Sequence, residues 1–535
     1  MPTITKNNKI IFNREDWLSG LHPQYTTTGQ FAQTGNGAST QECFNPFRFL
    51  GYAAPGFNPV ATTNAATVLS SYIRNGFNSG ANAYLIEQGA KIHRFVIASN
   101  TFTNDTVTAK FPHTVSAHAG HTTPILNDCV LYNHKVGGTL AQRYLYSWVD
   151  NTDWDVGTCD MNTTTATFDD EFMSTKPSTP LDLSSGYEAG KDYPHPLIVG
   201  DNDILYIGDR NFVHGYDGQS SLDNDGAFIP AALTLPQGYI ITSFAKIAPK
   251  TLCIFAYYSN TSNVDSYYRG TSKCFFWNYL DLDPYDVEDL NDNYVSEAFE
   301  YEGTVGCFTS GRPTDLSNGT KNSKLKLYDG DKFVDKSYFI GNPPIRGGVD
   351  ILGKEIRWVT SSGGNIFSYN NNFGLPATLN IIGVSQGSAT LSGILRTFGI
   401  ASVIVSSATA GPNYYFNTIY TDYAGGLYRT SLLELDENID INEIRVKFLY
   451  TATGGRAFTL HIHDEFGSTL YELISNLKVI TATNKTLTIP ALRTDGTTIP
   501  SLRRFKLSLS WGAGDGATDC PIVSQIELSY KPSKY

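Results

Sequence analysis

Charged residues are scarce in this sequence, and the basic ones are scattered. Only 17% of the 535 residues are charged, and the formal net charge at pH 7 is −12. A surface that wraps nucleic acid needs clustered lysine and arginine to neutralise phosphates, and the sequence has no such cluster. We therefore predict no specific recognition of nucleic acid.

Long apolar runs are also missing. No stretch approaches the roughly 20 apolar residues that cross a bilayer, so we expect no membrane span. The first residues, MPTITKNNKIIFNREDW, have neither an apolar signal core nor a small-residue cleavage motif. We expect a protein that is made and kept in a cytoplasm, or released by lysis rather than by secretion.

Cysteine is infrequent and irregularly placed. The seven cysteines never show CxxC spacing: Cys43, Cys129, Cys159, Cys253, Cys274, Cys307 and Cys520. Four of them, at positions 129, 253, 274 and 307, lie in apolar runs typical of strands, where a thiol packs as a small hydrophobic group. We predict reduced structural cysteines, with neither a disulfide framework nor a zinc site.

The sequence does contain a repeated β-type motif: a short apolar run, a turn, and a second run that ends in an aromatic residue or Asp-Gly. Seven copies begin near Ala83, Cys129, Ile204, Leu252, Val305, Glu355 and Ser402. Subtracting successive start positions gives intervals of 46, 75, 48, 53, 50 and 47 residues. Five of these intervals fit a unit of four short strands, which is the size of a propeller blade.

The motif and the composition together predict an all-β protein. We expect a seven-bladed β-propeller over residues 76–428, because closure removes the exposed sheet edges that would otherwise aggregate. The long interval holds an insertion at about 150–192, which is either a functional loop or a surface excursion. Alternation along CFFWNYL puts Phe275 and Trp277 on one face and Phe276 on the other, so we expect Trp277 to pack between neighbouring sheets.

Different patterns flank the predicted propeller. Residues 429–535 show alternating strands separated by turns, which predicts an antiparallel β-sandwich whose closing strand, at about 522–530, pairs near the opening one. Residues 1–75 form an irregular N-terminal arm in which residues 9–12 are a candidate strand that completes a blade.

The arm holds many large apolar groups without the periodicity of a core of its own: Trp17, Leu18, Leu21, Phe44, Phe47, Phe49, Leu50, Tyr52 and Phe57. We expect the arm to be buried against the propeller or a neighbouring subunit.

Two groups of side chains have the composition of metal sites. His113, His118 and His121, with His134 further on, are spaced as transition-metal ligands can be, but no HExxH motif or nearby carboxylate accompanies them. The second group is an acidic run: Asp281, Asp283, Asp286, Glu288, Asp289 and Asp292. It lacks the glycine and the terminal glutamate of a Ca²⁺-binding EF-hand loop. We favour imidazoles bonded to loop carbonyls and solvated loop charge, and predict no metal and no cofactor.

Three enzyme signatures are incomplete. Residues 221–228 resemble the Asp-box of sialidases, but Asp225 stands where the box has glycine, and no tryptophan follows. The arginine triad of a sialidase cannot be assigned from the candidates Arg210, Arg312, Arg346 and Arg396. Residues 383–387 match GxSxG, yet a helix does not follow. A carboxylate pair of another glycoside hydrolase stays open, because such pairs are defined in space. We predict no catalytic residues and a non-enzymatic protein.

Several segments resemble a known group of proteins. The order PHPLIVGDNDILYIGDRNFVHGYDG, LTLPQGYIITSF and LCIFAYYS, followed by CFFWNYLD, is similar to the β-propeller virion proteins of tailed bacteriophages. The C-terminal segments GLYRTSLLELDENIDINEIRVKF and FKLSLSWGAGDG resemble the sandwich that follows such propellers. The likeness covers roughly residues 80–535.

The resemblance implies a structural component of a virion, at the tail tube, nozzle or connector, in a homo-oligomeric ring with other virion proteins. It also implies assembly in the cytoplasm of a host bacterium. Two other classes stay open, because propellers host unrelated functions. One is a receptor-binding or glycan-degrading propeller on the virion exterior, and the other is a cytoplasmic propeller enzyme or scaffold.

Overall fold

The computed structural model describes most of the strands of the chain and the turns between many of them. Besides the elements named below, its longest described stretches are residues 125–149, 195–221, 224–258, 271–310, 322–340, 348–359, 432–449, 501–512 and 520–533. The chain divides into two compact units. Unit 1 comprises Met1–Val60, Asn365–Ser385 and Asn417–Tyr535, and unit 2 comprises Ala61–Gly364 and Gln386–Phe416.

Five four-stranded sheets follow one another along the chain, and each keeps its strands in sequence order. The first two contain β9 (Ile125–Val136), β10 (Thr139–Val149), β11 (Trp154–Asp160) and β12 (Phe168–Asp169), then β13 (Leu197–Val199), β14 (Leu205–Asp209), β15 (Phe212–Asp217) and β16 (Ala227–Thr234). The third contains β17 (Tyr239–Ile247), β18 (Thr251–Tyr258), β19 (Lys273–Trp277) and β20 (Asp286–Asp289). The last two contain β21 (Tyr294–Tyr301), β22 (Thr304–Ser310), β23 (Asn322–Tyr328) and β24 (Phe333–Ile340), then β25 (Val349–Leu352), β26 (Glu355–Val359), β27 (Ile366–Tyr369) and β28 (Thr378–Ile381).

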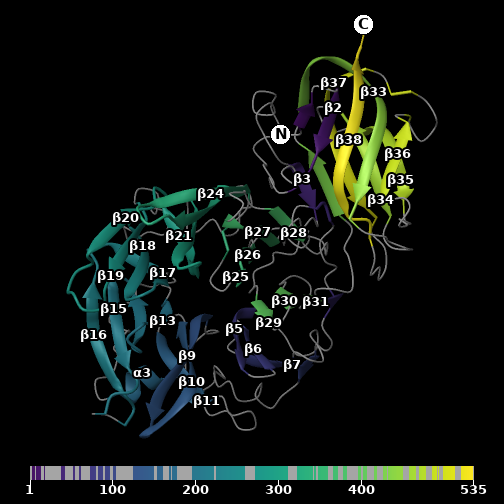
Figure 1. Cartoon of the computed structure of the whole chain (residues 1–535). Coiled ribbons are helices and arrows are strands. Elements are labelled where there is room, and N and C mark those ends of the chain that lie inside the picture. The colour runs from purple at the N-terminus through teal and green to yellow at the C-terminus, as the bar shows by residue number, and fades with distance from the viewer. Residues whose placement is uncertain are drawn as a thin grey trace. The chain divides into compact units, whose positions relative to one another are not determined.

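These sheets form a β-propeller arrangement (Figure 1). The first strands of successive sheets contact one another, β9 with β13, β13 with β17, β17 with β21 and β21 with β25. The all-β fold and the propeller are therefore confirmed. The structure shows five blades, which corrects the prediction of seven, and it contains two more four-stranded sheets.

Those two sheets have the strand orders β5-β6-β7-β8 and β29-β30-β31-β4. Their strands are β4 (Val60–Ala61), β5 (Ile73–Ser79), β6 (Asn82–Glu87), β7 (Lys91–Val96), β8 (Thr101–Thr103), β29 (Arg396–Phe398), β30 (Ser402–Val405) and β31 (Tyr415–Thr418). In the second sheet, β4 from the N-terminal part of the sequence pairs with strands more than 300 residues later in the chain.

The predicted insertion at 150–192 contains regular structure. Strand β11 pairs antiparallel with β10 and β12, so this segment supplies half of the β9–β12 blade. The short helix α3 (Phe172–Thr175) contacts β11, and its Phe172 and Met173 are fully buried. These strands were not predicted from the sequence, because the segment is rich in threonine and aspartate and its apolar positions are sparse.

The predicted alternation along β19 is confirmed. Phe275 and Trp277 lie in one apolar cluster with Tyr206 of the β13–β16 blade, whereas Phe276 lies in another with Val295 of the β21–β24 blade. Successive side chains of a strand point to opposite faces, so β19 supplies the packing on both sides of its sheet. The indole of Trp277 stands edge-on to the Tyr206 ring, with centroids 5.3 Å apart.

Unit 1 contains one ten-stranded sheet. Its strands are β1 (Thr3–Thr5), β2 (Lys9–Phe12), β3 (Ala38–Glu42), β32 (Gly426–Thr430), β33 (Leu433–Phe448), β34 (Phe458–His463), β35 (Thr469–Leu477), β36 (Thr486–Pro490), β37 (Leu502–Trp511) and β38 (Val523–Pro532). The closing strand β38 pairs antiparallel with the long strand β33, as the sequence predicted. Leu433 and Glu434 of β33 pair with β37, and Ile439 pairs with both β37 and β38.

The N-terminal segment belongs partly to this unit, which corrects the expectation that residues 9–12 complete a blade. Strand β2 pairs with β38, with Ile10 opposite Leu528 and Phe12 opposite Ile526. Ile10, Phe12 and Trp17 have no exposed surface and share a core with β33 and β38. The alternation in Lys9–Phe12 signals a strand, but strand pairing with β38 is a tertiary contact that local pattern cannot identify. Of the other large apolar residues of the predicted arm, Tyr52 packs against the same core, and the rest lie outside the described residues.

We predict that Trp277→Ala destabilises the protein by about 3 to 5 kcal/mol, because Trp277 is 2% exposed and its removal leaves a cavity between two blades. The substitution also removes the hydrogen bond from Trp277 Nε1 to the Asp281 carbonyl, which is 2.6 Å long. Thermal and urea unfolding measure the loss. Leu280→Ala, at a side chain that is 85% exposed, is the control. Equal stability of the two variants would place the indole on the surface.

Candidate functional site

Four charged side chains, of which Lys326 is buried and the others are partly buried, face one another where the β17–β20 and β21–β24 blades meet. Asp292 is in the connection between β20 and β21, and Thr309 is on β22. Lys324 and Lys326 are two residues apart on β23, so both side chains leave the same face of the strand. Asp335 is on β24, directly opposite Lys326. We call Asp292, Lys324, Lys326 and Asp335 the four-charge network.

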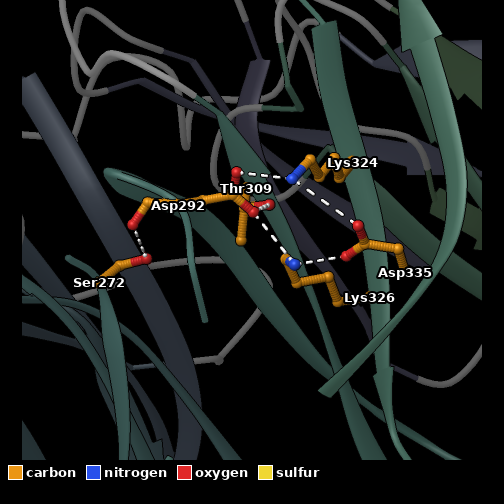
Figure 2. Close-up of polar contacts among 6 residues, drawn as sticks. All are labelled: Ser272, Asp292, Thr309, Lys324, Lys326 and Asp335. Carbon is orange, nitrogen blue, oxygen red and sulfur yellow. Dashed lines mark hydrogen bonds and ion pairs between the residues drawn. The ribbon is translucent and has the colours of Figure 1, made fainter. Parts of the chain in front are cut away.

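Figure 2 shows the two carboxylates and the two ammonium groups facing one another. Lys324 Nζ lies 2.9 Å from Asp292 Oδ1 and 3.7 Å from Asp335 Oδ2. Lys326 Nζ lies 3.1 Å from Asp292 Oδ2 and also pairs with Asp335 Oδ1. The hydroxyl of Thr309 donates to Asp292 Oδ2 over 2.8 Å. Each lysine therefore contacts both aspartates.

The electrostatics of this network oppose catalysis by its lysines. Burial lowers the pKa of Lys324, but the hydrogen bond and charge of Asp292, followed by those of Asp335, raise the pKa above its ordinary value. An ammonium with a raised pKa keeps its proton, and a nucleophilic or basic lysine must lose it. The side chain of Lys326 is only 4% exposed. The four side chains thus form a set of ion pairs in which each charge is neutralised by the others.

The network is connected to the backbone of the preceding blade. Ser272, just before β19, donates to the Asp292 carbonyl both from its hydroxyl and from its backbone N–H, each over 2.7 Å. Asp292 therefore joins the two blades, with its carbonyl bonded to one and its carboxylate to the other. This arrangement fixes the position of β21 relative to β19.

Similar polar links occur at other blade junctions. The buried carboxylate of Asp128 on β9 accepts a 2.6 Å hydrogen bond from the backbone N–H of Leu197 at the start of β13. Ser243 on β17 accepts from the N–H of Ala298 on β21 over 3.0 Å. The Tyr301 hydroxyl donates to the Lys354 carbonyl over 2.9 Å.

Asp155 holds helix α3 against β11. Its carboxylate accepts from the N–H of Val156 over 2.6 Å and from the hydroxyl of Ser174 on α3. Burial raises the pKa of Asp155 to about 7, although both hydrogen bonds lower it. Titration of this carboxyl near neutral pH makes Asp155 the described acid most able to couple pH to local structure.

Of the four histidines considered as metal ligands, only His134 is described. It is fully buried, and its ring nitrogens lie 3.2 Å from the Tyr216 hydroxyl and 3.1 Å from the Thr158 hydroxyl. Burial, with a smaller effect from Arg143, lowers its pKa to about 3, so the imidazole is neutral. His134 thus links the β9–β12 blade to the β13–β16 blade. His113, His118 and His121 lie outside the described residues.

The residues of the incomplete enzyme signatures are partly described. Asp225 of the Asp-box-like segment accepts from the N–H of Gly137 over 2.6 Å, and the Asn224 carbonyl accepts from Gly138 N over 2.7 Å. This segment therefore contacts the β9–β10 turn. Arg210 lies in the turn between β14 and β15. The side chains of Arg312, Arg346 and Arg396, and residues 383–387, lie outside the described residues.

The acidic run separates into two parts. Asp281 through Asp289 lie in the β19–β20 connection and in β20, whereas Asp292 belongs to the four-charge network. Within the described part of the chain, no three His, Cys, Asp or Glu side chains are grouped as metal ligands would be. Among these same residues, no helix has the length and apolar content of a bilayer-crossing segment.

The described cysteines occupy the predicted surroundings. Cys129, Cys253, Cys274 and Cys307 lie in strands β9, β18, β19 and β22, and the last three are fully buried in one apolar cluster. Burial raises the pKa of Cys307 in spite of the nearby Lys326 ammonium. These buried groups are therefore thiols that contribute apolar packing.

The four-charge network was not predicted from the sequence. The segment KLKLYDG does signal a strand with two lysines on one face and Leu325 and Leu327 on the other. Leu325 and Leu327 are buried as expected, and Lys326 is also buried. A lysine between buried leucines is the available signal, but its partners lie elsewhere in the sequence, Asp292 in the β20–β21 connection and Asp335 on β24.

The comparisons with known proteins give no family for this chain. No protein-family model matches it, and no curated protein matches it. Among solved structures, similarity is found to the computationally designed Ika8 protein, with 13% identity, a TM-score of 0.38, and coverage of 66% of this chain and 99% of that one.

Two natural proteins are also similar. The Cps50 (Swd1) β-propeller domain of Myceliophteria thermophila has 8% identity, a TM-score of 0.40, and coverage of 68% of this chain and 99% of that one. An exo-β-1,3-galactanase of Phanerochaete chrysosporium, solved with galactose, has 11% identity, a TM-score of 0.32, and coverage of 88% and 100%.

We predict that Lys326→Met destabilises the protein by about 2 to 3 kcal/mol, because it leaves two partly buried carboxylates with one ammonium fewer, and their remaining exposure reduces the cost of an unpaired charge. Urea unfolding followed by circular dichroism measures the change. Lys332→Met, at an exposed position in the β23–β24 turn, should differ from the wild type by less than about 0.5 kcal/mol. A stability loss that is the same for both variants would refute a specific role of the network.

We predict that Asp155 makes stability fall as pH rises. The pKa of Asp155 is raised on folding, so its contribution is fully present below its ordinary pKa of 3.8 and is lost as pH rises to about 7. The loss is roughly 1.4 kcal/mol for each pKa unit. In Asp155→Asn this part of the pH dependence should vanish. Unfolding free energies of both proteins across this pH range test the sign, and identical slopes would contradict it.

Proposed function

We propose that this protein is a non-enzymatic structural component of a tailed-phage virion, in a ring at the tail tube, nozzle or connector. The proposal combines the sequence resemblance with the propeller arrangement of the four-stranded sheets. Because propellers host unrelated functions, the fold by itself does not decide between a structural and a catalytic role. Whether the polar groups bond to protein partners or stay open to a substrate therefore says more about the role than the fold does.

One observation carries the proposal: the ionisable side chains that we described at the blade junctions bond to one another, or to backbone and hydroxyl groups of the protein. Asp128 accepts from the Leu197 N–H, and Asp292 pairs with Lys324 and Lys326. Catalytic acids and bases need open access to a substrate, whereas these groups have protein partners. Such links stiffen a propeller, as a load-transmitting ring component requires.

We also propose two finer features of the architecture. The sheets β5–β8 and β29-β30-β31-β4 are the sixth and seventh blades, supported by the contacts of β5 with β9 and of β25 with β29. The ten-stranded sheet of unit 1 folds over as a β-sandwich. In support, one core combines Ile444 and Ile526, from the β33–β38 pair, with Leu460 and Leu509, from the β34–β37 pair.

In this proposal the partners are further copies of the chain and other virion proteins, and assembly takes place in the cytoplasm of the host bacterium. Part of the N-terminal segment is committed to its own chain, since Ile10 and Phe12 are buried beside β38. Exchange between subunits is therefore proposed only for the part of residues 1–75 beyond these anchored positions.

We predict that the purified full-length protein forms closed rings. Native mass spectrometry should give a fixed number of copies, and negative-stain images should show the ring, because a tail component is held in the symmetry of the particle. Screening against surface polysaccharides of candidate host bacteria is the parallel measurement. A monomer that cleaves such a glycan would refute the structural role and favour the exterior, glycan-degrading alternative.

A further inference from the structure

The connection between β19 and β20 exposes an unusual concentration of apolar side chains. Four of the six large apolar residues that are prominently exposed in the described part of the chain lie within eight positions: Leu280 at 85%, Leu282 at 86%, Tyr285 at 55% and Val287 at 41%. Scattered exposed apolar residues are normal, but a group of them marks an interaction site. We call these four residues the apolar loop.

Hydrogen bonds hold the backbone of the apolar loop in one conformation. Asn278 Oδ1 accepts from the N–H groups of Leu280 and Asp281, each over 3.0 Å, and Trp277 Nε1 donates to the Asp281 carbonyl over 2.6 Å. The Tyr285 N–H donates to the Phe276 carbonyl over 2.9 Å. The loop is thus fixed to the buried part of β19, and its leucines are exposed. Because the loop is already ordered, it loses little conformational entropy when a partner binds.

The surroundings of the apolar loop are strongly acidic. The sequence has no lysine or arginine between Lys273 and Arg312. Carboxylates of Asp281, Asp283 and Asp286 lie within or beside the loop and are exposed, whereas the exposed Asp289 pairs with Lys273 over 3.3 Å. Asp329 and Asp331, in the β23–β24 turn, are close enough to influence Glu288. Burial first, then Asp286 and Asp331, raise the pKa of Glu288.

We propose that the apolar loop docks a partner protein that offers an apolar pocket bordered by lysine and arginine. Leu280 and Leu282 would fill the pocket, and the surrounding carboxylates would face the basic border. The acidic charge around the apolar loop selects this occupant. The same loop of a second copy would bring like charges together, and an anionic membrane surface would repel it. The inference is independent of the virion proposal.

The test uses the full-length protein and a synthetic amphipathic helix of leucine and lysine, labelled with a fluorophore. Fluorescence anisotropy should show saturable binding that weakens as salt rises. The double variant Leu280→Ser, Leu282→Ser should weaken binding by roughly tenfold or more. An analogous helix of leucine and glutamate should not bind.

Two matched controls separate the loop from general attraction to an acidic protein. Leu140→Ser changes a leucine that is 53% exposed elsewhere. The charge variant Asp283→Asn, Asp331→Asn is compared with Asp436→Asn, Glu437→Gln, which removes two exposed carboxylates from β33 in unit 1. The double leucine variant and the Asp283→Asn, Asp331→Asn variant should weaken binding. Leu140→Ser and the charge variant in unit 1 should bind as the wild type does. The thermal midpoints of all variants should be unchanged.

The proposal is overturned if both charge variants weaken binding equally, or if the double leucine variant binds as the wild type does. Sedimentation of the wild type and the double leucine variant tests whether the loop binds a second copy of the protein instead. If the substitution abolishes self-association of the protein, the loop contacts a second copy, and the basic partner is refuted.

Discussion

The structure depends on one constraint: sheets that are covered on both faces need partners for the polar groups that lie between them. Strand β19 illustrates the apolar part, since Phe275 and Trp277 fill one side of their sheet and Phe276 fills the other. Buried polar atoms without partners cost free energy, so the groups at the junctions need protein partners. Asp128, Ser243 and Asp292 supply them by reaching a neighbouring blade.

The four-charge network shows how far this constraint extends. A buried ion pair is weak evidence for stability, because desolvation of the charges offsets much of their attraction. The network instead restricts the geometry of the junction, because two lysines and two aspartates can all be paired in only a few relative positions of β23, β24 and the β20–β21 connection. The exposed leucines of the apolar loop are the opposite case, because nothing in the described chain covers them.

Much of the architecture was predictable because strand alternation and blade spacing are local properties. The alternation in CFFWNYL, the pairing of β38 with β33, and the all-β propeller were all recognisable. The strands at Trp154–Asp160 and Phe168–Asp169 were not, because their sparse apolar pattern resembles a loop. Among the candidate ligands, His134 could not be distinguished from a metal ligand until Tyr216 and Thr158 were placed beside it.

By itself, the sequence determined the fold class, the repeat, the strand faces and the acidic character of the β19–β20 connection. These follow from composition and from the two-residue period of a strand. Only the tertiary structure decided that Lys9–Phe12 pairs with β38 and that Lys324 and Lys326 meet Asp292 and Asp335. The reason is that edge pairing and charge pairing join residues distant in sequence, whose proximity no local pattern encodes.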